Sequence, residues 1–213
     1  MNPGKLITLE GGEGVGKTTN LEMIAHYLRG QGKDVVVTRE PGGTRLGEAI
    51  RSLLLNPETE PPADDAELLL MFAARAQHLD RVIRPALRAG RWVLSDRFTD
   101  ASYAYQGGGR GIDRTRIQML EEWVQGSLRP DLTLLLDAPP EVGLERARGR
   151  GAPDRFESEQ IAFFQKVRRE YLQLAVRFPE RIKQVDATQP LAVVQSEIIG
   201  HLQCLLKSAP SPA

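Results

Sequence analysis

A glycine-rich segment near the start of the chain restricts the possible folds more than any other feature of the sequence. Gly11 to Thr18 reads GGEGVGKT and fits the pattern GxxxxGK[ST]. An apolar run precedes it, and a segment of helical period follows it. Glycines let backbone N–H groups turn inward around an anion, and the following helix presents its positive N-terminal end to the same anion. The segment therefore predicts a triphosphate-binding loop between a strand and a helix.

The residues of this segment have expected roles in holding a nucleoside triphosphate. Lys17 would bridge the β and γ phosphates, and the Thr18 hydroxyl would ligate Mg²⁺. The residues predicted to bind ATP are Gly11, Gly12, Glu13, Gly14, Val15, Gly16, Lys17 and Thr18. A glycine-rich turn that binds nothing is the alternative. The motif by itself does not separate kinases from GTPases, motor ATPases or transporter subunits.

Short apolar runs alternate with segments of helical period along the rest of the chain, which predicts an α/β fold around a parallel sheet. Strands are expected at 6–10, 34–38, 92–95, 132–137 and 182–185. Helices are expected at 17–30, 45–55, 64–89, 114–126, 140–148, 158–178 and 191–206. Pro85 is expected to kink or end the third helix.

The composition predicts one domain over residues 1–207, with a disordered tail at 208–213. Lys plus Arg and Asp plus Glu both count 28, so no net charge attracts a long nucleic acid. No apolar run reaches the roughly 20 residues that a membrane span needs. Cys204 is the single cysteine, which excludes an intramolecular disulfide and favours a cytoplasmic protein. Its apolar neighbours predict that its side chain is buried.

An acidic and a basic residue follow the third predicted strand. Asp96 and Arg97 would lie at the carboxyl edge of the sheet, where open α/β folds bind ligands. A carboxylate there can hold the hydration shell of Mg²⁺, and an Arg offers a bidentate fork to a phosphate. A surface ion pair is the alternative, which the preceding triphosphate loop disfavours.

Arginines are concentrated in the segment ERARGRGAPDRFE at 145–157, where glycines and a proline interrupt the helical pattern. Arg146, Arg148, Arg150 and Arg155 lie in this segment. A basic loop of this kind predicts a lid that closes over ATP and excludes water. A solvated basic loop is the alternative.

Four stretches of the chain resemble thymidylate kinases of the bacterial type, and the resemblance covers nearly the whole sequence. They are EGGEGVGKTT at 10–19, TREPGGT at 38–44, DRFTDASYAYQGGGRG at 96–111 and DRFE at 154–157. The resemblance implies ordered phosphoryl transfer from MgATP to dTMP, giving dTDP and ADP. It also implies a three-layer P-loop NTPase fold with a five-stranded parallel sheet flanked by helices, a lid over about 146–157, and a homodimer.

The resemblance assigns roles to individual residues of the acceptor site. Phe72 would stack on thymine, and Arg75, which lies three residues further along the same predicted helix, would donate to a base carbonyl. Arg97 and Arg39 would bind the dTMP phosphate. The residues expected to contact base or sugar are Ser102, Tyr105 and Gln106, with Tyr105 crowding a ribose 2′-OH. The arginine-rich lid resembles one subtype of the family, in which Glu13 is expected near the acceptor sugar. Pro41 is a candidate for a cis peptide bond, although trans is the default.

Catalysis would then rest on positioning and charge neutralisation, with no dedicated general base, because the acceptor is already an anion. The residues expected to act in the transfer are Lys17, Asp96, Arg97, Arg148 and Arg150. A kinase for another nucleotide or a deoxynucleoside is the nearest alternative. More distant alternatives are a P-loop switch protein and, last, a nucleic-acid-binding ATPase. The sequence has no evident N-K-x-D motif, which argues against a GTPase.

Overall fold

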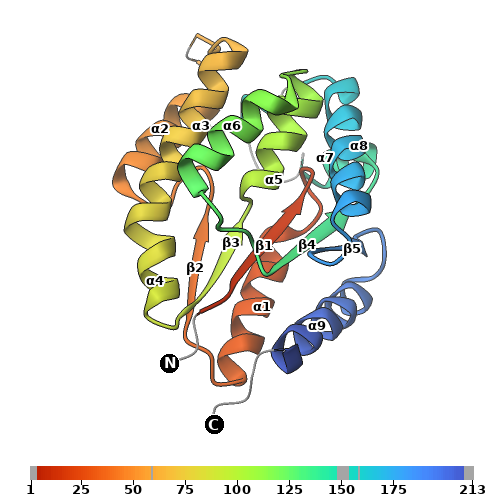
Figure 1. Ribbon diagram of the computed structural model, residues 1–213. Helices are drawn as coiled ribbons and strands as arrows, with labels where there is room; N and C mark the ends of the chain where they lie inside the picture. The colour runs from red at the N-terminus through yellow and green to blue at the C-terminus, as the bar shows by residue number, and fades with distance from the viewer. Residues whose placement is uncertain (1–3, 59, 148–153, 158, 209–213) are drawn as a thin grey trace.

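The computed structural model describes residues 4–58, 60–147, 154–157 and 159–208, which fold around one five-stranded sheet (Figure 1). The strands are β1 (Leu6–Gly11), β2 (Val35–Arg39), β3 (Trp92–Asp96), β4 (Leu132–Asp137) and β5 (Ile182–Asp186). They are all parallel and lie in the order β2-β3-β1-β4-β5. The predicted parallel α/β architecture is confirmed. Because β1 and β3 are neighbours, the segments that follow them leave the same edge of the sheet side by side.

Successive residues of the buried strands face opposite helical layers. Ile7 and Leu9 pack in one apolar cluster with residues of α1 (Lys17–Gly30) and α9 (Leu191–Ser208). Leu6 belongs to a second cluster, which lies on the other face. This alternation follows from the period of two along a strand. Burial on both faces explains why β1, β3 and β4 carry apolar residues on both sides, whereas the edge strands β2 and β5 are only partly buried.

The remaining helical elements pack on the sheet or on one another. They are α2 (Arg45–Leu55), α3 (Asp64–His78), the π-helix η1 (Leu79–Ile83), α4 (Arg84–Arg88), α5 (Thr99–Ser102), the π-helix η2 (Tyr103–Gly109), α6 (Arg114–Gln125), α7 (Pro140–Ala147) and α8 (Ile161–Arg177). The predicted helix at 64–89 is therefore three consecutive elements. Pro85 lies in the first turn of α4 and cannot donate a hydrogen bond to the preceding turn, which is the wider π-helical one.

Two expectations about secondary structure were wrong. No helix was expected at 99–109, but α5 and η2 occupy this segment. The glycines of YQGGG have low helix propensity, and the helical turns are held by packing of η2 against α8. The helix expected at 158–178 is α8, which begins at Ile161 and not at residue 158. The strands end up to one residue later than expected, so that Arg39 and Asp96 belong to β2 and β3.

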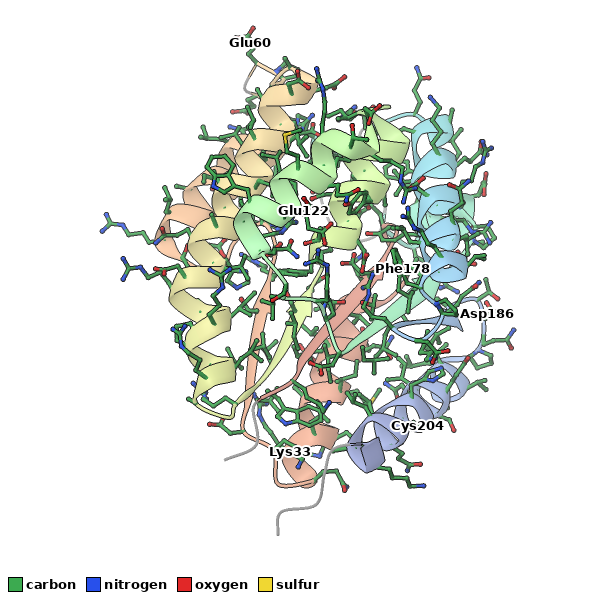
Figure 2. The ribbon with its side chains drawn as sticks, viewed as in Figure 1. Lys33, Glu60, Glu122, Phe178, Asp186 and Cys204 are labelled. Atoms are coloured by element: carbon green, nitrogen blue, oxygen red, sulfur yellow. The ribbon has the colours of Figure 1, made fainter. Side chains whose placement is uncertain are left out.

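The predicted burial of Cys204 was also wrong. Its side chain is exposed on α9, as Figure 2 shows. The buried positions of α9 are Val194, Ile198 and Leu202, which are spaced four residues apart along one face. Cys204 lies two residues past this row and therefore points away from the core. Ser208 ends α9, so helix continues one residue into the segment predicted as tail, and 209–213 lie outside the described residues.

None of the helices in the described part of the chain combines the length and the hydropathy that crossing a bilayer requires.

Candidate active site

The glycine-rich loop connects β1 to α1 and has an open helix N-terminus at its end. Gly14 and Gly16 have φ angles of 67° and 91°, in the left-handed region that glycine adopts without strain. No side chain caps the first turn of α1, so its N–H groups stay available for an anion. Lys17 is buried, and its Nζ donates to the carbonyl oxygens of Gly11 (3.2 Å) and Gly12 (2.6 Å). The geometry matches the predicted triphosphate loop.

This loop packs directly against the backbone of α7. A Cβ atom on Gly14 would lie 1.8 Å from the carbonyl oxygen of Gly143, and a Cβ on Gly143 would lie 2.2 Å from that of Glu13. Both distances are far below any real contact, so each position requires glycine. The loop and the helix that leads into the arginine-rich segment are therefore in backbone contact.

A strained turn follows β3 beside the loop. Arg97 has a φ of 67° and is the one residue other than glycine with a positive φ among those described. Its N–H donates to Leu9 O (3.0 Å), and the next N–H, of Phe98, donates to Glu10 Oε1 (2.7 Å). Backbone strain of this kind persists only where surrounding contacts impose it, and it commonly marks functional sites. Here the turn directs the Arg97 side chain toward the glycine-rich loop.

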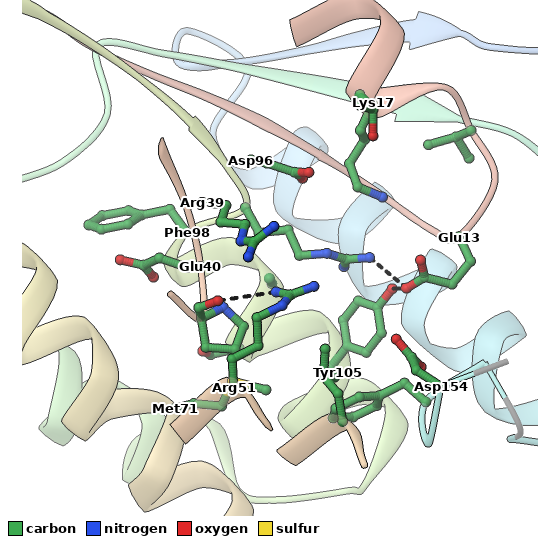
Figure 3. Close-up of a pocket in the computed structure, with 18 of the residues that line it drawn as sticks. Glu13, Lys17, Arg39, Glu40, Arg51, Met71, Asp96, Phe98, Tyr105 and Asp154 are labelled. Atoms are coloured by element: carbon green, nitrogen blue, oxygen red, sulfur yellow. Dashed lines mark hydrogen bonds and ion pairs between the residues drawn. The ribbon is translucent and has the colours of Figure 1, made fainter. Parts of the chain in front are cut away.

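Glu13 and Tyr105 point toward each other in the cavity (Figure 3), and Arg97, which also lines it, contacts both. Glu13 Oε1 accepts hydrogen bonds from Arg97 Nη2 (2.6 Å) and from the Tyr105 hydroxyl (2.7 Å). The Arg97 guanidinium also lies over the Tyr105 ring, 4.6 Å from its centroid. Arg97 Nη1 is buried and has no hydrogen-bond partner among the described residues. A buried donor without a partner is costly, so this nitrogen is suited to an anionic ligand.

The electrostatics around Glu13 and Arg97 favour charged side chains. Burial alone would raise the pKa of Glu13, but the Arg97 guanidinium and the Lys17 ammonium lower it to about 2. Burial would lower the pKa of Arg97, but Glu13 and other neighbours hold it well above its ordinary value. The cavity therefore keeps a carboxylate and a guanidinium ionised over the whole physiological pH range.

Arg51 is a cavity residue that the sequence did not reveal. It projects from α2 and donates from Nη1 to Pro41 O (3.1 Å), a contact that Figure 3 marks. Burial and the positive charges of Arg39 and Arg97 lower its pKa. The guanidinium groups of Arg39, Arg51 and Arg97 thus line the same cavity, and such a group of cations suits a phosphate dianion. Its only sequence signal was an Arg three residues after Glu48 in a helical pattern, which is ordinary on a helix surface.

Arg39 also lines this region, as expected, although its Nη2 is 2.8 Å from Glu48 Oε2 and its side chain is 53% exposed. The Glu40–Pro41 bond that follows it is cis.

Most of the residues expected to contact a base or sugar line the same cavity. Arg75, Ser102, Tyr105 and Gln106 line it. Phe72, which was expected to stack on the base, is not among the lining residues.

Phe72 instead packs in an apolar cluster with Leu68, Ile112 and Ile117, and the Arg75 guanidinium lies over its ring at 4.6 Å. Met71 lines the cavity in its place. Side chains four residues apart lie above one another on a helix, so Met71 shares the cavity-facing side of α3 with Arg75, whereas Phe72 is turned toward α6.

The described part of the predicted lid closes one side of the cavity. Asp154 and Phe156 line it, and the Phe156 ring packs edge-on against that of Tyr105. Arg155 is anchored away from the cavity, because it donates to Glu67 Oε2 (2.6 Å) and to Leu54 O (2.7 Å). Arg148 and Arg150, which were expected to act in the transfer, lie outside the described residues.

The expected metal ligands lie together in the same cavity of about 250 Å³. Thr18 is exposed at the start of α1, and Asp96 Oδ1 is buried without a hydrogen-bond partner among the described residues. An unpartnered carboxylate oxygen beside a triphosphate loop fits a hydrated Mg²⁺. Within the described ranges there is no group of three or more His, Cys, Asp or Glu side chains that could hold a metal by itself. A divalent ion would therefore depend on phosphate oxygens as additional ligands.

The fold and this cavity, with a triphosphate loop on one side and converging arginines on the other, are those of a P-loop nucleoside-monophosphate kinase. A sequence model described as thymidylate kinase matches residues 9–198. The chain therefore belongs to the thymidylate kinase family.

Individual relatives support this assignment over nearly full length. The thymidylate kinase of Ectopseudomonas mendocina is 62% identical over 205 residues, which are 96% of this chain and 98% of that protein. The thymidylate kinase of Methylococcus capsulatus is 58% identical over 206 residues, 97% of this chain and 98% of that protein. The crystal structure of thymidylate kinase from Ehrlichia chaffeensis, at 33% identity, superposes with a TM-score of 0.77 and covers 94% of this chain and 99% of that one.

Proposed function

We infer that this chain transfers the γ-phosphoryl group of ATP to dTMP, giving dTDP and ADP. It is an ATP-dependent nucleoside-monophosphate kinase, a phosphotransferase that serves nucleotide biosynthesis. The observation that carries the proposal is one cavity that joins the glycine-rich loop to two guanidinium nitrogens, of Arg97 and Arg75, that have no hydrogen-bond partner among the residues the structure describes. One anion binds at the loop, a second at Arg97, and the acceptor base reaches Arg75.

Transfer depends on bringing two polyanions into line and neutralising their charge. Lys17 leaves its carbonyl partners in the loop to bind the β and γ phosphates. Arg97, with Arg51 and Arg39, binds the acceptor phosphate, whose oxygen is already ionised and attacks without a general base. Arg148 and Arg150 of the lid are proposed to reach the phosphoryl group in transit.

Mg²⁺ is the proposed cofactor, and the Thr18 hydroxyl and the Asp96 carboxylate would hold it. When bound, it supplies charge neutralisation across the phosphates. The unpartnered Asp96 Oδ1 supports this assignment.

The base and sugar are proposed to bind in the part of the cavity that Arg75 and Met71 line. Arg75 donates to a carbonyl of thymine, and Met71 packs on the ring, taking the part expected of Phe72. Ser102 and Gln106 line the base pocket, and Glu13 and Tyr105 lie where the sugar passes. The Tyr105 hydroxyl, fixed on Glu13, restricts the space available to a 2′-OH.

The active form is proposed to be a homodimer. Leu69 of α3 and Met119 and Trp123 of α6 are exposed by 56%, 68% and 82% on two helices that pack together. Exposed large apolar side chains on two adjoining helices support a protein interface. The cytoplasm is the proposed location, which cell fractionation tests.

A coupled assay of ADP formation tests the activity. Purified protein with MgATP is offered dTMP, dUMP, dCMP, dGMP and AMP, and dTMP is expected to give the highest kcat/KM. Preference for any other acceptor would overturn the substrate assignment. ADP release that no acceptor stimulates would favour a nucleotide-binding switch protein.

A further inference from the structure

Arg75 is buried and rigidly oriented, although it lines the acceptor cavity. Its Nη2 donates to Phe98 O (3.2 Å) and to Ser102 Oγ (3.1 Å), and its Nε donates to Glu40 Oε2 (2.7 Å). Nη1 alone is buried without a partner among the described residues. Three fixed acceptors leave the planar guanidinium one orientation, so that Nη1 is the nitrogen left to donate to a ligand in the cavity that Arg75 lines.

Glu40 is held in place from the side opposite Arg75. Its Oε1 is 2.9 Å from Nδ1 of His78, whose side chain is fully buried. Burial would raise the pKa of Glu40, but Arg75 and His78 lower it, so the carboxylate is ionised and Nδ1 of His78 is the donor. His78 Nε2 lies 2.6 Å from Thr38 Oγ1 at the end of β2. The chain Thr38–His78–Glu40–Arg75 therefore ties β2 to the last turn of α3.

The turn after Glu40 closes over this chain. A Cβ on Gly43 would lie 2.6 Å from both His78 Nε2 and Thr38 Oγ1, so the turn has no space for a larger residue. The His78 ring cannot swing outward while this turn is in place. Neither His78 nor Thr38 lines the cavity, so their effect on a ligand passes through Glu40 and Arg75.

We propose that His78 and Glu40 are positioning residues that set the base selectivity of the enzyme by fixing the direction of Arg75 Nη1. The proposal rests on the dTMP kinase activity inferred above and takes the C4 carbonyl of thymine as the partner of Nη1. Cytosine carries an amino donor at this carbon. A guanidinium with one permitted orientation binds the carbonyl and opposes the amino group, whereas a guanidinium free to rotate distinguishes them less.

Two substitutions at one position separate the contact with Glu40 from the contact with Thr38. In His78→Asn the amide nitrogen can occupy the place of Nδ1 and still donate to Glu40. In His78→Gln it occupies the place of Nε2, and the donor to Glu40 is lost. Both variants remove the ring, so each serves as the control for the other.

Kinetics with dTMP, dUMP and dCMP give the readout, supplemented by dissociation constants where turnover is slow. In His78→Gln we expect KM for dTMP to rise about tenfold, which corresponds to about 1.4 kcal/mol, the value of one hydrogen bond. The rise should be equal for dUMP, which keeps the C4 carbonyl, and smaller for dCMP. The constants kcat and KM for ATP should change less than about threefold, and His78→Asn should keep the wild-type preference for dTMP over dCMP.

An unchanged ratio of dTMP to dCMP efficiency in a folded His78→Gln protein would overturn the proposal. Equal loss in both His78 variants would do the same, because it would indicate a merely structural role. If His78→Gln fails to fold, Glu40→Gln provides the second test, with the same expected fall in the ratio. A wild-type enzyme that phosphorylates none of the three nucleotides would instead defeat the inferred activity.

Discussion

Replacing Glu10 by Gln is expected to change the way in which the stability of the enzyme depends on pH. Glu10 is fully buried at the end of β1, beside the turn that carries Arg97. Burial and the negative charge of Asp100 raise its pKa from 4.5 to about 8, against the opposing effects of Tyr171, Arg97 and the Phe98 N–H. The folded protein therefore keeps a proton on Glu10 that the unfolded chain has lost, over most of the range between pH 4.5 and pH 8.

Because the folded state binds more protons in this range, its stability falls as pH rises. The loss accumulates at about 1.4 kcal/mol per pH unit, which gives roughly 3 kcal/mol between pH 5 and pH 7.5. The neutral side chain of Glu10→Gln removes this contribution. The free energy of unfolding of the variant should therefore rise relative to that of the wild type by roughly this amount over the same pH range.

Urea denaturation at half-unit steps of pH measures the difference directly. Tyr171→Phe is the matched control, because it removes the hydroxyl that contacts Glu10 Oε2 at 2.8 Å and leaves the carboxyl group in place. The control should retain the wild-type slope. Parallel curves for Glu10→Gln and the wild type would show that Glu10 does not titrate in this range and would refute the reasoning.

Five further substitutions, in four experiments, test the site. Arg97→Ala should lower kcat by about 10²- to 10³-fold and leave ATP affinity, measured by calorimetry, nearly unchanged; near-normal turnover would remove Arg97 from the site. Asp96→Asn should raise the Mg²⁺ concentration needed for half-maximal rate, and an unchanged titration would contradict its role. Gly14→Ala should abolish ATP binding, since its Cβ would lie 1.8 Å from a backbone oxygen of α7, and normal binding would show that the loop can move aside. Met71→Ala should raise KM for dTMP more than Phe72→Leu does; the reverse order would restore Phe72 as the stacking residue.

The sequence predicted the parts of the fold whose cause is local. Short apolar runs, the period of 3.6 and the glycine-rich loop predicted the five strands and most of the helices to within a few residues. The segment 99–109 could not be predicted in this way, because its helical turns are held by packing against α8 and not by intrinsic propensity. Cys204 was misplaced for a related reason: its neighbours are apolar, but the burial of a helical residue depends on its angle around the axis.

The candidate site was predicted where a motif fixes backbone geometry and less well where side chains converge from separate elements. Lys17 and Arg97 follow strands at a common edge, so their proximity follows from the parallel sheet. Arg51 reaches the cavity from α2, and nothing in its own neighbourhood distinguishes it from a surface residue. The difference between Met71 and Phe72 is a rotation of about 100° around α3, which requires knowing the face that α3 turns to the cavity.

The groups proposed to bind phosphate and the groups proposed to face the base belong to different kinds of structural element. Arg97 directly follows β3, and Lys17 begins α1 at the end of the loop that follows β1, whereas Met71 and Arg75 belong to α3. Changes in α3 can therefore alter which nucleobase is accepted without moving the two phosphates relative to each other. An engineer seeking activity on a nucleotide analogue should vary this helix first and leave the strand ends untouched.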